Sequence, residues 1–528
     1  MSFIRAQNLK RDDGGAVIRG SAAIIVSTYA PGQKHHSKQS VRENLGKVLW
    51  LHLDKKSGIF LSPLRGSVGY DAGKDEFFEV SASDDRLPAT AKAQEPARHV
   101  VFGDAYVLLE FMKARGILGL LRNINNRPAF YARLLGHICH AVLRDCSRIS
   151  CDDFLEKSFL AHLLRETPAG SFATDTPFFT QMADDRMKTA FFQAWAKLMK
   201  KLYPGFGGCC YVDSTPLPND VEDNPYNALC RHGTNSSGIQ TRLALIPDEQ
   251  TGLPVRYCLI PGNVLDLSTL QSVREDVCKT PGVTITSLVP DAGYASKENL
   301  AAFADPQKFG HLLLRMPAKK GYPFKTLYWE VKDKISKGKY AFVRHGHTYF
   351  GEKKEIEVFA HSFHAFVYAD QENALNGFRK YLDSHEDEYG KLRDKDKDYY
   401  RMKFGYFVLL SNTDNTPAGA LDEYFGRTSI EGFFKTSKEH MCLLPLRKWT
   451  ETTIKGKLLF DMISIIVYIE LRKKLKAGKI SVSSMIGKAQ SLMCLCNSTG
   501  NVNVDTPSKG ARLAMEALDT SKDFNKVP

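Results

Sequence analysis

The chain has 528 residues, which corresponds to several domains rather than one. Hydrophobic residues make up 43% of it and charged residues 25%, a balance that permits a packed core and excludes a wholly disordered chain. Lys and Arg outnumber Asp and Glu by 72 to 59, so the net charge of +13 favours a polyanionic partner, either nucleic acid or an acidic membrane surface.

Signals for secretion and membrane insertion are the next features to consider. Residues 1–20 mix basic and acidic side chains and contain no apolar segment of the kind that a secretory signal needs. The longest apolar run, residues 458–471, includes Asp461 and Glu470 and is shorter than a membrane span, so it predicts a buried helix. The eleven cysteines include no C-x-x-C pair, which fits reduced thiols. We therefore expect a cytoplasmic protein with no membrane partner.

The first two regions of the chain differ in their patterns. Residues 1–98 are mixed: residues 16–28 resemble a strand, whereas the Pro-containing stretch 84–98 is typical of a linker. Residues 99–204 carry apolar side chains at helical spacing, most clearly over 188–201. We expect a mixed N-terminal region followed by a helical region, in which no helix-turn-helix signature is evident.

The helical region contains a group of potential metal ligands, namely His137, Cys139, His140 and Cys146. Their spacing matches no common structural zinc pattern. Two interpretations remain open: a zinc site, or small side chains packed on one helix.

Strand patterns begin near residue 205. The apolar run 209–212 ends at Asp213, and the run 284–289 is followed by Pro290 and Asp291. Between them, two further apolar runs flank the polar turn 247–252 and predict a hairpin. The alternation of strands and helices over this part predicts a mixed α/β domain covering residues 205–480.

A block with a different pattern, about residues 305–402, interrupts that domain. It contains short strands in a lysine-rich setting and then a highly charged helix over 372–403, after which a buried strand resumes at 406–410. We interpret the block as a β-rich insertion. Residues 481–528 are largely polar, and we expect them to form a loosely ordered tail.

Two aspartates stand where strands are predicted to end. The ends of buried strands are rigid and open toward a cleft, so Asp213 and Asp291 are well placed for chemistry. Two divalent ions require several hard oxygen ligands from different elements, and such ions promote phosphodiester cleavage. Taken singly, each aspartate fits an ordinary turn or helix-capping residue equally well.

A third carboxylate, Glu431, lies in a segment with a helical pattern. On a helix of about 100° per residue, Tyr424, Arg427, Glu431 and Lys438 fall within an arc of about 60°. One face would thus carry a metal-binding carboxylate beside two cations that suit DNA phosphates. The alternative is a solvated face with an ion pair between Arg427 and Glu431.

These residues resemble the insertion-sequence-four group of DDE transposases, which carries a Y-x2-R-x3-E-x6-K signature. Tyr424, Arg427, Glu431 and Lys438 satisfy every spacing of that signature. Asp213, at the end of a strand, matches the first aspartate of the group, and the segment 291–294 matches its D-x-G-x segment. The resemblance covers about residues 205–475.

The resemblance implies a ribonuclease-H-like catalytic domain interrupted by a β-rich insertion. Asp213, Asp291 and Glu431 would hold two Mg²⁺ ions, with Mn²⁺ as a substitute, for the hydrolysis of DNA at the ends of an insertion sequence. The freed 3′-OH end would then attack target DNA in the same site.

The resemblance also implies the partners. Tyr424, Arg427 and Lys438 would contact the backbone of double-stranded DNA, and Tyr294 is a candidate for stacking on a flipped base. Residues 1–98 are expected to contribute to binding of the terminal inverted repeats. Paired-end cleavage implies a homodimer on DNA, located in the bacterial cytoplasm in association with the nucleoid.

Three other interpretations differ in their chemistry. A ribonuclease-H-like nuclease without strand transfer shares the same carboxylates, and a DNA-binding protein with a decayed site lacks only the reaction. A serine or cysteine hydrolase has little support, because the chain contains no G-x-S-x-G motif and no histidine in an evident triad context.

Overall fold

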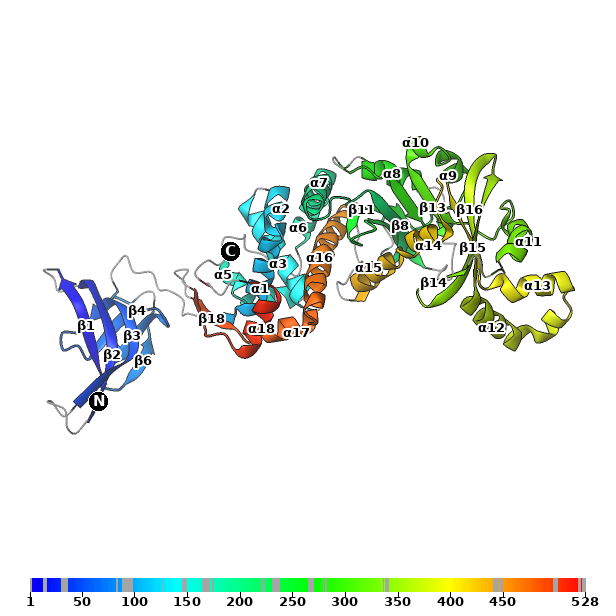
Figure 1. Ribbon diagram of the computed structural model, residues 1–528. Helices are drawn as coiled ribbons and strands as arrows, with labels where there is room; N and C mark the ends of the chain where they lie inside the picture. Colours follow the sequence, from blue (N-terminus) through cyan, green and yellow to red (C-terminus); the bar gives the residue numbers. More distant parts are fainter. Residues whose placement is uncertain are drawn as a thin grey trace.

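The computed structural model describes residues 2–12, 17–29, 37–81, 84–87, 98–125, 127–144, 150–163, 171–172, 175–219, 221, 224–229, 238–264, 270–278, 280, 283–335, 337, 341–439, 446, 450–496, 502–520 and 524. They form a mixed α/β protein with three sheets, as the sequence predicts. Figure 1 shows a small β-sheet at one end, a helical region in the middle and a large sheet at the other end.

The N-terminal sheet is entirely antiparallel, with its six strands in chain order. Its core is separate from that of the remaining chain and is built from Ile24, Leu45, Phe60 and Tyr70 with their neighbours. The region expected to be mixed is thus a β-meander, because apolar residues alternate along strands that the sequence pattern revealed only in part. Its strands are β1 (Ser2–Arg11), β2 (Val17–Tyr29), β3 (Ser37–Leu51), β4 (Ser57–Ser62), β5 (Gly66–Asp71) and β6 (Glu76–Glu79).

The helical region draws on two distant parts of the chain. Its first part comprises α1 (Gly103–Ala114), α2 (Ile117–Ile124), α3 (Pro128–Leu143), α4 (Cys151–Glu156), α5 (Leu160–Leu163), α6 (Thr176–Met182) and α7 (Asp185–Leu202). The second part begins with α16 (Glu451–Ala477), which packs against α6 and α3 and buries the predicted apolar run. No helix in the described residues is both long and apolar enough to span a membrane.

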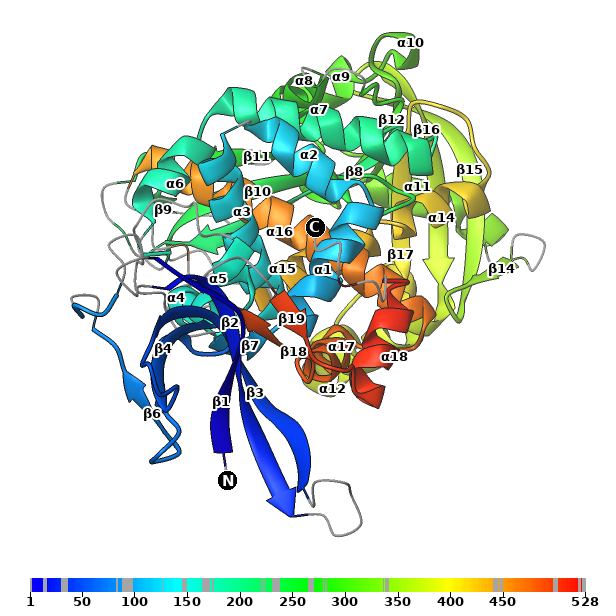
Figure 2. The same ribbon diagram turned by 90° about the vertical axis from the view of Figure 1, so that its left-hand side faces the viewer.

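The C-terminal residues are more ordered than their polar composition predicts. They contain α17 (Val482–Ala489), β18 (Met493–Cys496), β19 (Val502–Val504) and α18 (Lys509–Ala517). Strand β18 pairs with β7 (Arg98–Val101), and α17 packs on α18 and α1. The expectation of a loose tail over 481–528 is therefore wrong for its described part, because a few buried residues such as Met485, Cys494 and Met515 anchor an otherwise polar surface. Figure 2 shows these elements beside α1.

The large sheet begins with the predicted strands. Five of its strands are β8 (Cys209–Pro218), β10 (Ile239–Pro247), β11 (Pro254–Pro261), β12 (Ser287–Pro290) and β13 (His311–Arg315), and the short β9 (Ala228–Leu229) pairs with β10. They lie in the order β11-β10-β8-β12-β13: β8, β10 and β11 are antiparallel neighbours, whereas β12 and β13 run parallel to β8. This order places the first strand of the sheet, β8, between an antiparallel neighbour on one side and a parallel neighbour on the other.

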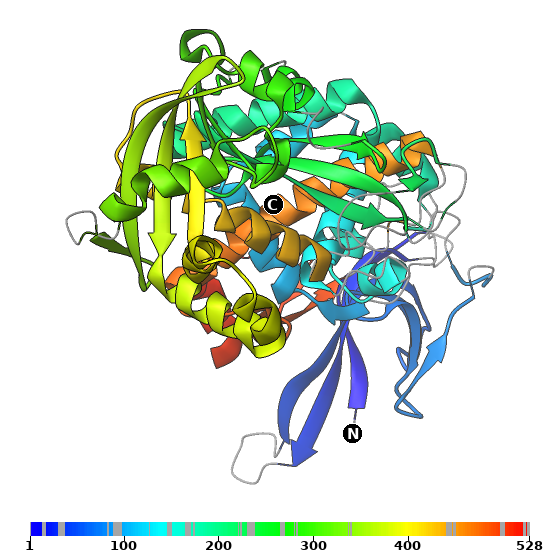
Figure 3. The same cartoon turned by 90° about the vertical axis from the view of Figure 1, so that its right-hand side faces the viewer.

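The block 305–402 extends this sheet instead of forming a separate module. After α11 (Phe324–Ile335), the strands β14 (Ala341–Arg344), β15 (His347–Val358) and β16 (His361–Asp370) join it through β17 (Tyr406–Ser411), which is antiparallel to β13. The predicted charged helix is two helices, α12 (Gln371–Gly390) and α13 (Asp394–Lys403), with a further kink at His385. Figure 3 shows the long curved sheet with α12 and α13 at its lower edge.

Candidate active site

Asp213 and Asp291 lie side by side on neighbouring parallel strands. The expectation that a strand ends at Asp213 is wrong, because β8 continues to Pro218 through its pairing with β10, whereas β12 does end at Pro290, just before Asp291. In the pairing of β8 with β12, Val212 is opposite Pro290, and the two aspartates are the next residue on each strand. Neighbouring strands are about 4.8 Å apart, and residues in register share a face of the sheet. The two carboxylates, which we call the acidic row, therefore point to the same side, as a shared metal site requires.

The segment that follows β17 lies along the same face of β8. Every second residue of a strand points to one face, and Cys209, Tyr211, Asp213 and Thr215 are such a series. Cys209 contacts Glu423, and Tyr211 contacts Gly426. Asp213 contacts Arg427, and Thr215 contacts Lys438. Two of the four signature positions, Arg427 and Lys438, thus contact this strand, and the signature segment runs along the strand that carries Asp213.

The signature does not occupy one continuous helix, and that expectation is wrong. Helix α14 (Pro417–Phe425) ends beside Gly426, and α15 (Thr428–Glu439) begins after Arg427. A Cβ atom on Gly426 would lie 1.7 Å from the hydroxyl of Tyr211, so only glycine allows the chain to approach β8 this closely. The bend lets α14 and α15 follow the twisted strand.

Arg427 joins the two aspartates. Its Nη1 donates to Asp291 Oδ1 over 3.0 Å, and its Nη2 lies 3.6 Å from Asp213 Oδ2. Nη1 also donates to the hydroxyl of Tyr424 over 3.1 Å, and the guanidinium lies over that ring at 5.4 Å. Burial lowers the pKa of Arg427, but Tyr424, Asp291 and Asp213 outweigh it and the pKa is raised. The guanidinium is therefore a fixed positive charge.

The exposure of these groups indicates where a ligand would approach. The side chain of Arg427 is only 14% exposed, whereas those of Asp213 and Asp291 are 25% and 45% exposed. Each carboxylate thus keeps solvent access on the side away from the guanidinium. Burial raises the pKa of Tyr424, which keeps its hydroxyl protonated and able to donate.

Glu431 stands near this pair but does not join it. It lies four residues after Arg427, which contacts Asp213, and seven before Lys438, which donates to Thr215 Oγ1 over 2.6 Å. Within α15, a step of seven residues places Glu431 and Lys438 on the same helix face, whereas Arg427 precedes the helix. Its side chain is exposed, and the three carboxylates do not come within 4.8 Å of one another.

The donor set fits a divalent cation at the aspartates. Both provide hard carboxylate oxygens, which Mg²⁺ and Mn²⁺ prefer. One guanidinium already spans the two carboxylates, so a positive charge between them is accommodated. Glu431 on α15 would reach a shared ion only through a change of its exposed side chain.

The other two residues expected to contact DNA, Tyr294 and Lys438, lie in different surroundings. Tyr294 is the last residue of a short 3-10 turn (Ala292–Tyr294), and it is only 1% exposed. A ring buried in the core is not available to stack on a base in this conformation. Lys438 does face the strand, and burial lowers its pKa.

The zinc interpretation finds no support among the described residues. His137 contacts Asp175 at 3.2 Å and lies against the ring of Phe178, whereas His140 contacts Ser150 at 3.1 Å. Cys139 is fully buried in the core. Cys146 lies outside the described residues. His137, Cys139 and His140 are therefore packing residues on α3, as the alternative interpretation has it.

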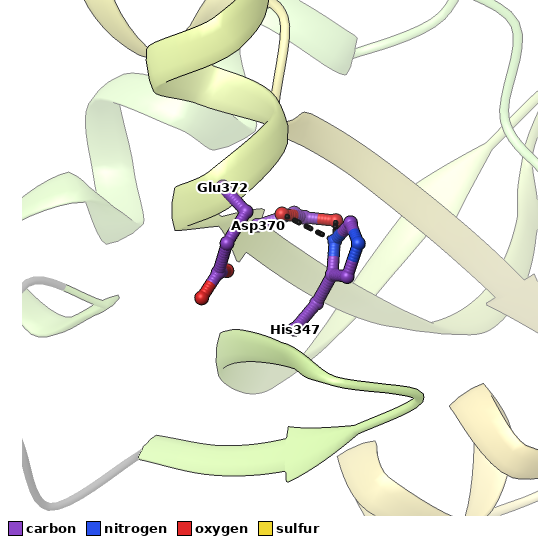
Figure 4. A group of neighbouring side chains, drawn as sticks. All are labelled: His347, Asp370 and Glu372. Carbon is purple, nitrogen blue, oxygen red and sulfur yellow. Dashed lines mark hydrogen bonds and ion pairs between the residues drawn. The ribbon is translucent and has the colours of Figure 1, made fainter.

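Sequence reasoning missed another group of potential ligands, His347, Asp370 and Glu372, whose ligand atoms lie within 4.8 Å of one another. Figure 4 shows the His347 ring facing the Asp370 carboxylate, and the Nδ1–Oδ2 distance is 3.0 Å. Asp370 also caps α12 through the backbone N–H of Asn373, and Glu372 accepts from Thr348. Because these bonds occupy the carboxylates, the group is a latch between β15 and α12. An aspartate between a strand and a helix was its only signal in the sequence.

A cavity of about 560 Å³ adjoins this latch and the signature segment. It is lined by basic and aromatic side chains, among them Arg315, His345, His347, Tyr349, Phe407, Tyr424 and Phe425. The cavity connects the extended part of the sheet with Tyr424, and through Tyr424 with Arg427.

Two lysines of β15, Lys353 and Lys354, are already neutralised by carboxylates. Lys353 pairs with Asp414 at 2.6 Å, and Lys354 pairs with Glu330. Lys319 and Lys320 are exposed in a loop after β13. In the described part of the chain, no carboxylate pairs with either of them. Lys319 and Lys320 therefore remain the better candidates for phosphate contacts.

Comparisons with known proteins give little further information. No protein-family model and no curated protein matches the chain. Among solved structures, a cryo-EM structure of a piggyBac transposase synaptic complex with hairpin DNA aligns with 79% of this chain and 79% of its own, at 9% identity and a TM-score of 0.37. A similarity this low establishes neither a family nor a function.

Proposed function

We propose that the chain is a DDE transposase that binds the terminal inverted repeats of an insertion sequence, cleaves the DNA and joins the 3′-OH end to target DNA. One observation carries the proposal: Asp213 on β8 and Asp291 just after β12 lie side by side on neighbouring parallel strands, and Arg427 of the signature segment lies between their carboxylates. Glu431 lies four residues after Arg427 in the Y-x2-R-x3-E-x6-K spacing, and its side chain is exposed.

Each residue of the site would have a separate role in phosphodiester cleavage. Asp213, Asp291 and Glu431 would hold two Mg²⁺ or Mn²⁺ ions, which supply a hydroxide-generating and charge-stabilising centre when bound. Arg427 and Lys438 are fixed cations on either side of Glu431 and would hold phosphates of the DNA backbone. Tyr424 keeps its proton and would donate to a phosphate oxygen.

Other parts of the chain would serve DNA binding. The N-terminal sheet has its own core and stands apart from the catalytic sheet, so it suits a module that contacts the element end at a distance from the cut. The excess of basic residues makes this binding sensitive to salt. We expect a homodimer on paired ends in the bacterial cytoplasm, at the nucleoid.

The decisive experiment uses the full chain, Mg²⁺ and a labelled duplex that carries the DNA flanking the coding region. Wild type is compared with Glu431→Gln and Asp213→Asn. The control is Asp422→Asn, because Asp422 is on the same helix as Tyr424 but forms an exposed ion pair with Arg344. We expect wild type and the control to nick the element end, and both site variants to bind the duplex without cutting it.

The outcomes separate the alternatives. Equal cleavage by all four proteins would refute the assignment of the carboxylates. Cleavage without joining to a second duplex would identify a metal-dependent nuclease, and tight binding without cleavage by wild type would identify a decayed DNA-binding protein.

A further inference from the structure

A second row of polar side chains crosses the two strands that carry the acidic row, four residues earlier, and continues onto the next strand, β13. Cys209, Ser287 and His311 are in register on β8, β12 and β13. We call these three residues the neutral row. They point to the same face as the aspartates, because a step of four residues along a strand restores the side-chain direction.

A single carboxylate from α14 reaches all three members of this row. Ser287 Oγ donates to Glu423 Oε1 over 2.9 Å, and His311 Nε2 lies 3.0 Å from the same oxygen. The thiol of Cys209 is at 4.0 Å. The side chains of Glu423 and His311 are only 16% and 17% exposed, so water does not compete strongly for these bonds.

The hydrogen bonds around His311 form a consistent chain of donors. Thr413 Oγ1 is within hydrogen-bond distance of His311 Nδ1, and Ser411 Oγ donates to the carbonyl of Thr413 over 2.7 Å. With Nδ1 as an acceptor, a neutral imidazole carries its proton on Nε2 and donates it to Glu423. The geometry does not form a hydrolase triad, because Ser287 donates to the carboxylate and not to the imidazole.

The position of Glu423 in the chain connects this network with the site. Glu423 lies four residues before Arg427, and Ser287 lies four residues before Asp291. The network therefore fixes the last turn of α14 against β12 and β13, just before the bend at Gly426 that aims Arg427 at both aspartates. A helix turn rises about 5.4 Å and four strand residues span about 13 Å, so both connections are short and stiff.

We propose that Glu423 is a positioning residue that acts through Arg427: its bonds to Ser287 and His311 hold Arg427 between Asp213 and Asp291. The inference rests on the proposed function for its effect on cleavage, but the placement of Arg427 is measurable without any reaction. Asp422 is the matched control, because it is the neighbouring acid on α14 and touches none of the three strands through its ion pair with Arg344.

The kinetic test compares Glu423→Ala, Glu423→Gln and Asp422→Ala at saturating DNA. We expect Glu423→Ala to lower the cleavage rate about tenfold or more while the Kd for DNA changes less than about threefold. Gln can accept from Ser287 and donate to the other tautomer of His311, so Glu423→Gln is expected to restore most of the rate, and Asp422→Ala to leave it unchanged.

A double-mutant cycle tests whether the effect passes through Arg427. In an Arg427→Ala background, Glu423→Ala should lower the rate by less than about twofold, because its target is gone. Full additivity of the two losses would overturn the proposal.

A spectroscopic readout separates this inference from the proposed function. The Nε of Arg427 is buried and without a hydrogen-bond partner in the described residues, so its N–H resonance in a ¹⁵N spectrum should differ from those of exposed arginines. The resonance is assigned to Arg427 by its loss in the Arg427→Lys variant. We expect the resonance to move to the exposed range in Glu423→Ala and to stay in Glu423→Gln, with melting curves confirming that both variants fold. An unchanged resonance in Glu423→Ala would overturn the inference even if wild type cleaves DNA, whereas a shifted resonance without cleavage by wild type would refute only the proposed function.

Discussion

The two polar rows of the large sheet differ in how completely their groups are bonded. In the neutral row, Ser287 and His311 give their hydrogens to one carboxylate, Glu423, and little solvent access remains. In the acidic row, two carboxylates share one guanidinium and remain partly exposed. The strands β8 and β12 thus carry a largely buried hydrogen-bond network in the neutral row and, four residues later, a partly exposed pair of carboxylates in the acidic row.

This difference shows how a sheet can combine a fixed scaffold with an available site. A satisfied buried network stabilises one arrangement of the helix on the strands, because breaking it leaves polar groups without partners. Carboxylates at the strand ends keep oxygens directed to solvent, which a metal or a ligand can use. The scaffold and the site are joined by the bend at Gly426.

The largest expected effect separates the two rows on one strand. Asp291→Asn should lower DNA cleavage about 10³-fold, because a neutral amide cannot stabilise the charges of a metal-assisted reaction. Ser287→Ala, on the same face of β12, should cost about 1 kcal/mol of stability for one neutral hydrogen bond and lower the rate no more than about threefold. Cleavage assays and urea unfolding check both values. Equal inactivation by the two variants would contradict the distinction between the rows.

The bend that joins the rows gives the next largest effect. Gly426→Ala should lower the free energy of unfolding by about 1–3 kcal/mol, because the new Cβ collides with the Tyr211 hydroxyl. Adding Tyr211→Phe should recover part of the loss. Gly432→Ala is the control: with no atom within 4 Å of its added Cβ, this exposed position of α15 should gain about 0.5–1 kcal/mol from the helix propensity of alanine. A destabilised Gly432→Ala would show that α15 is constrained by something other than the bend.

The cation at the far end of the signature gives a dependence on pH. Burial lowers the pKa of Lys438, so the folded chain loses this charge at a lower pH than an ordinary lysine does. DNA affinity should therefore begin to fall earlier as the pH rises, and Lys438→Arg should remove that early fall. Between the lowered folded pKa and the ordinary unfolded one, the unfolded chain binds more protons, so the stability contributed by this group rises with pH. Affinity and stability measured across the alkaline range should move in opposite directions.

The smallest effect concerns the lysines of the extended sheet. Lys319→Ala with Lys320→Ala should reduce the slope of log affinity against log salt by about 0.9 for each phosphate contact removed. Lys353→Ala with Lys354→Ala should change the slope less, because Asp414 and Glu330 already neutralise those charges. Identical slopes for the two double variants would mean that neither pair contacts the duplex.

Several elements of the large sheet follow from the sequence because their signals are local. The hairpin over β10 and β11 appears as two apolar runs around a polar turn, and β8 and β12 appear as apolar runs that end at Asp213 and Asp291. Residues 458–471 lie inside α16 as a buried helix. Alternation and run length indicate the type of such elements, since each element buries its own apolar face.

Other features could not be predicted because they depend on distant partners. The signature pattern gives no sign that the helix breaks at Gly426, since the break is set by Tyr211 on a strand far away in the chain. Burial of Tyr294 and the pairing of β18 with β7 are likewise decided by packing. The strands of the block 305–402 looked like a module of their own, and only their pairing through β17 places them in the central sheet.

The sequence by itself determined the mixed α/β class, the two strands at which Asp213 and Asp291 lie and the spacing that sets Glu431 between two cations. Only the tertiary structure decided which of these groups meet: that Arg427 lies between Asp213 and Asp291, that Glu431 remains exposed, and that Glu423 holds the helix on the neutral row. The physical reason is that residue type and local period specify an element and its buried face, whereas contacts between elements arise from strand register and close packing, which involve residues hundreds of positions apart.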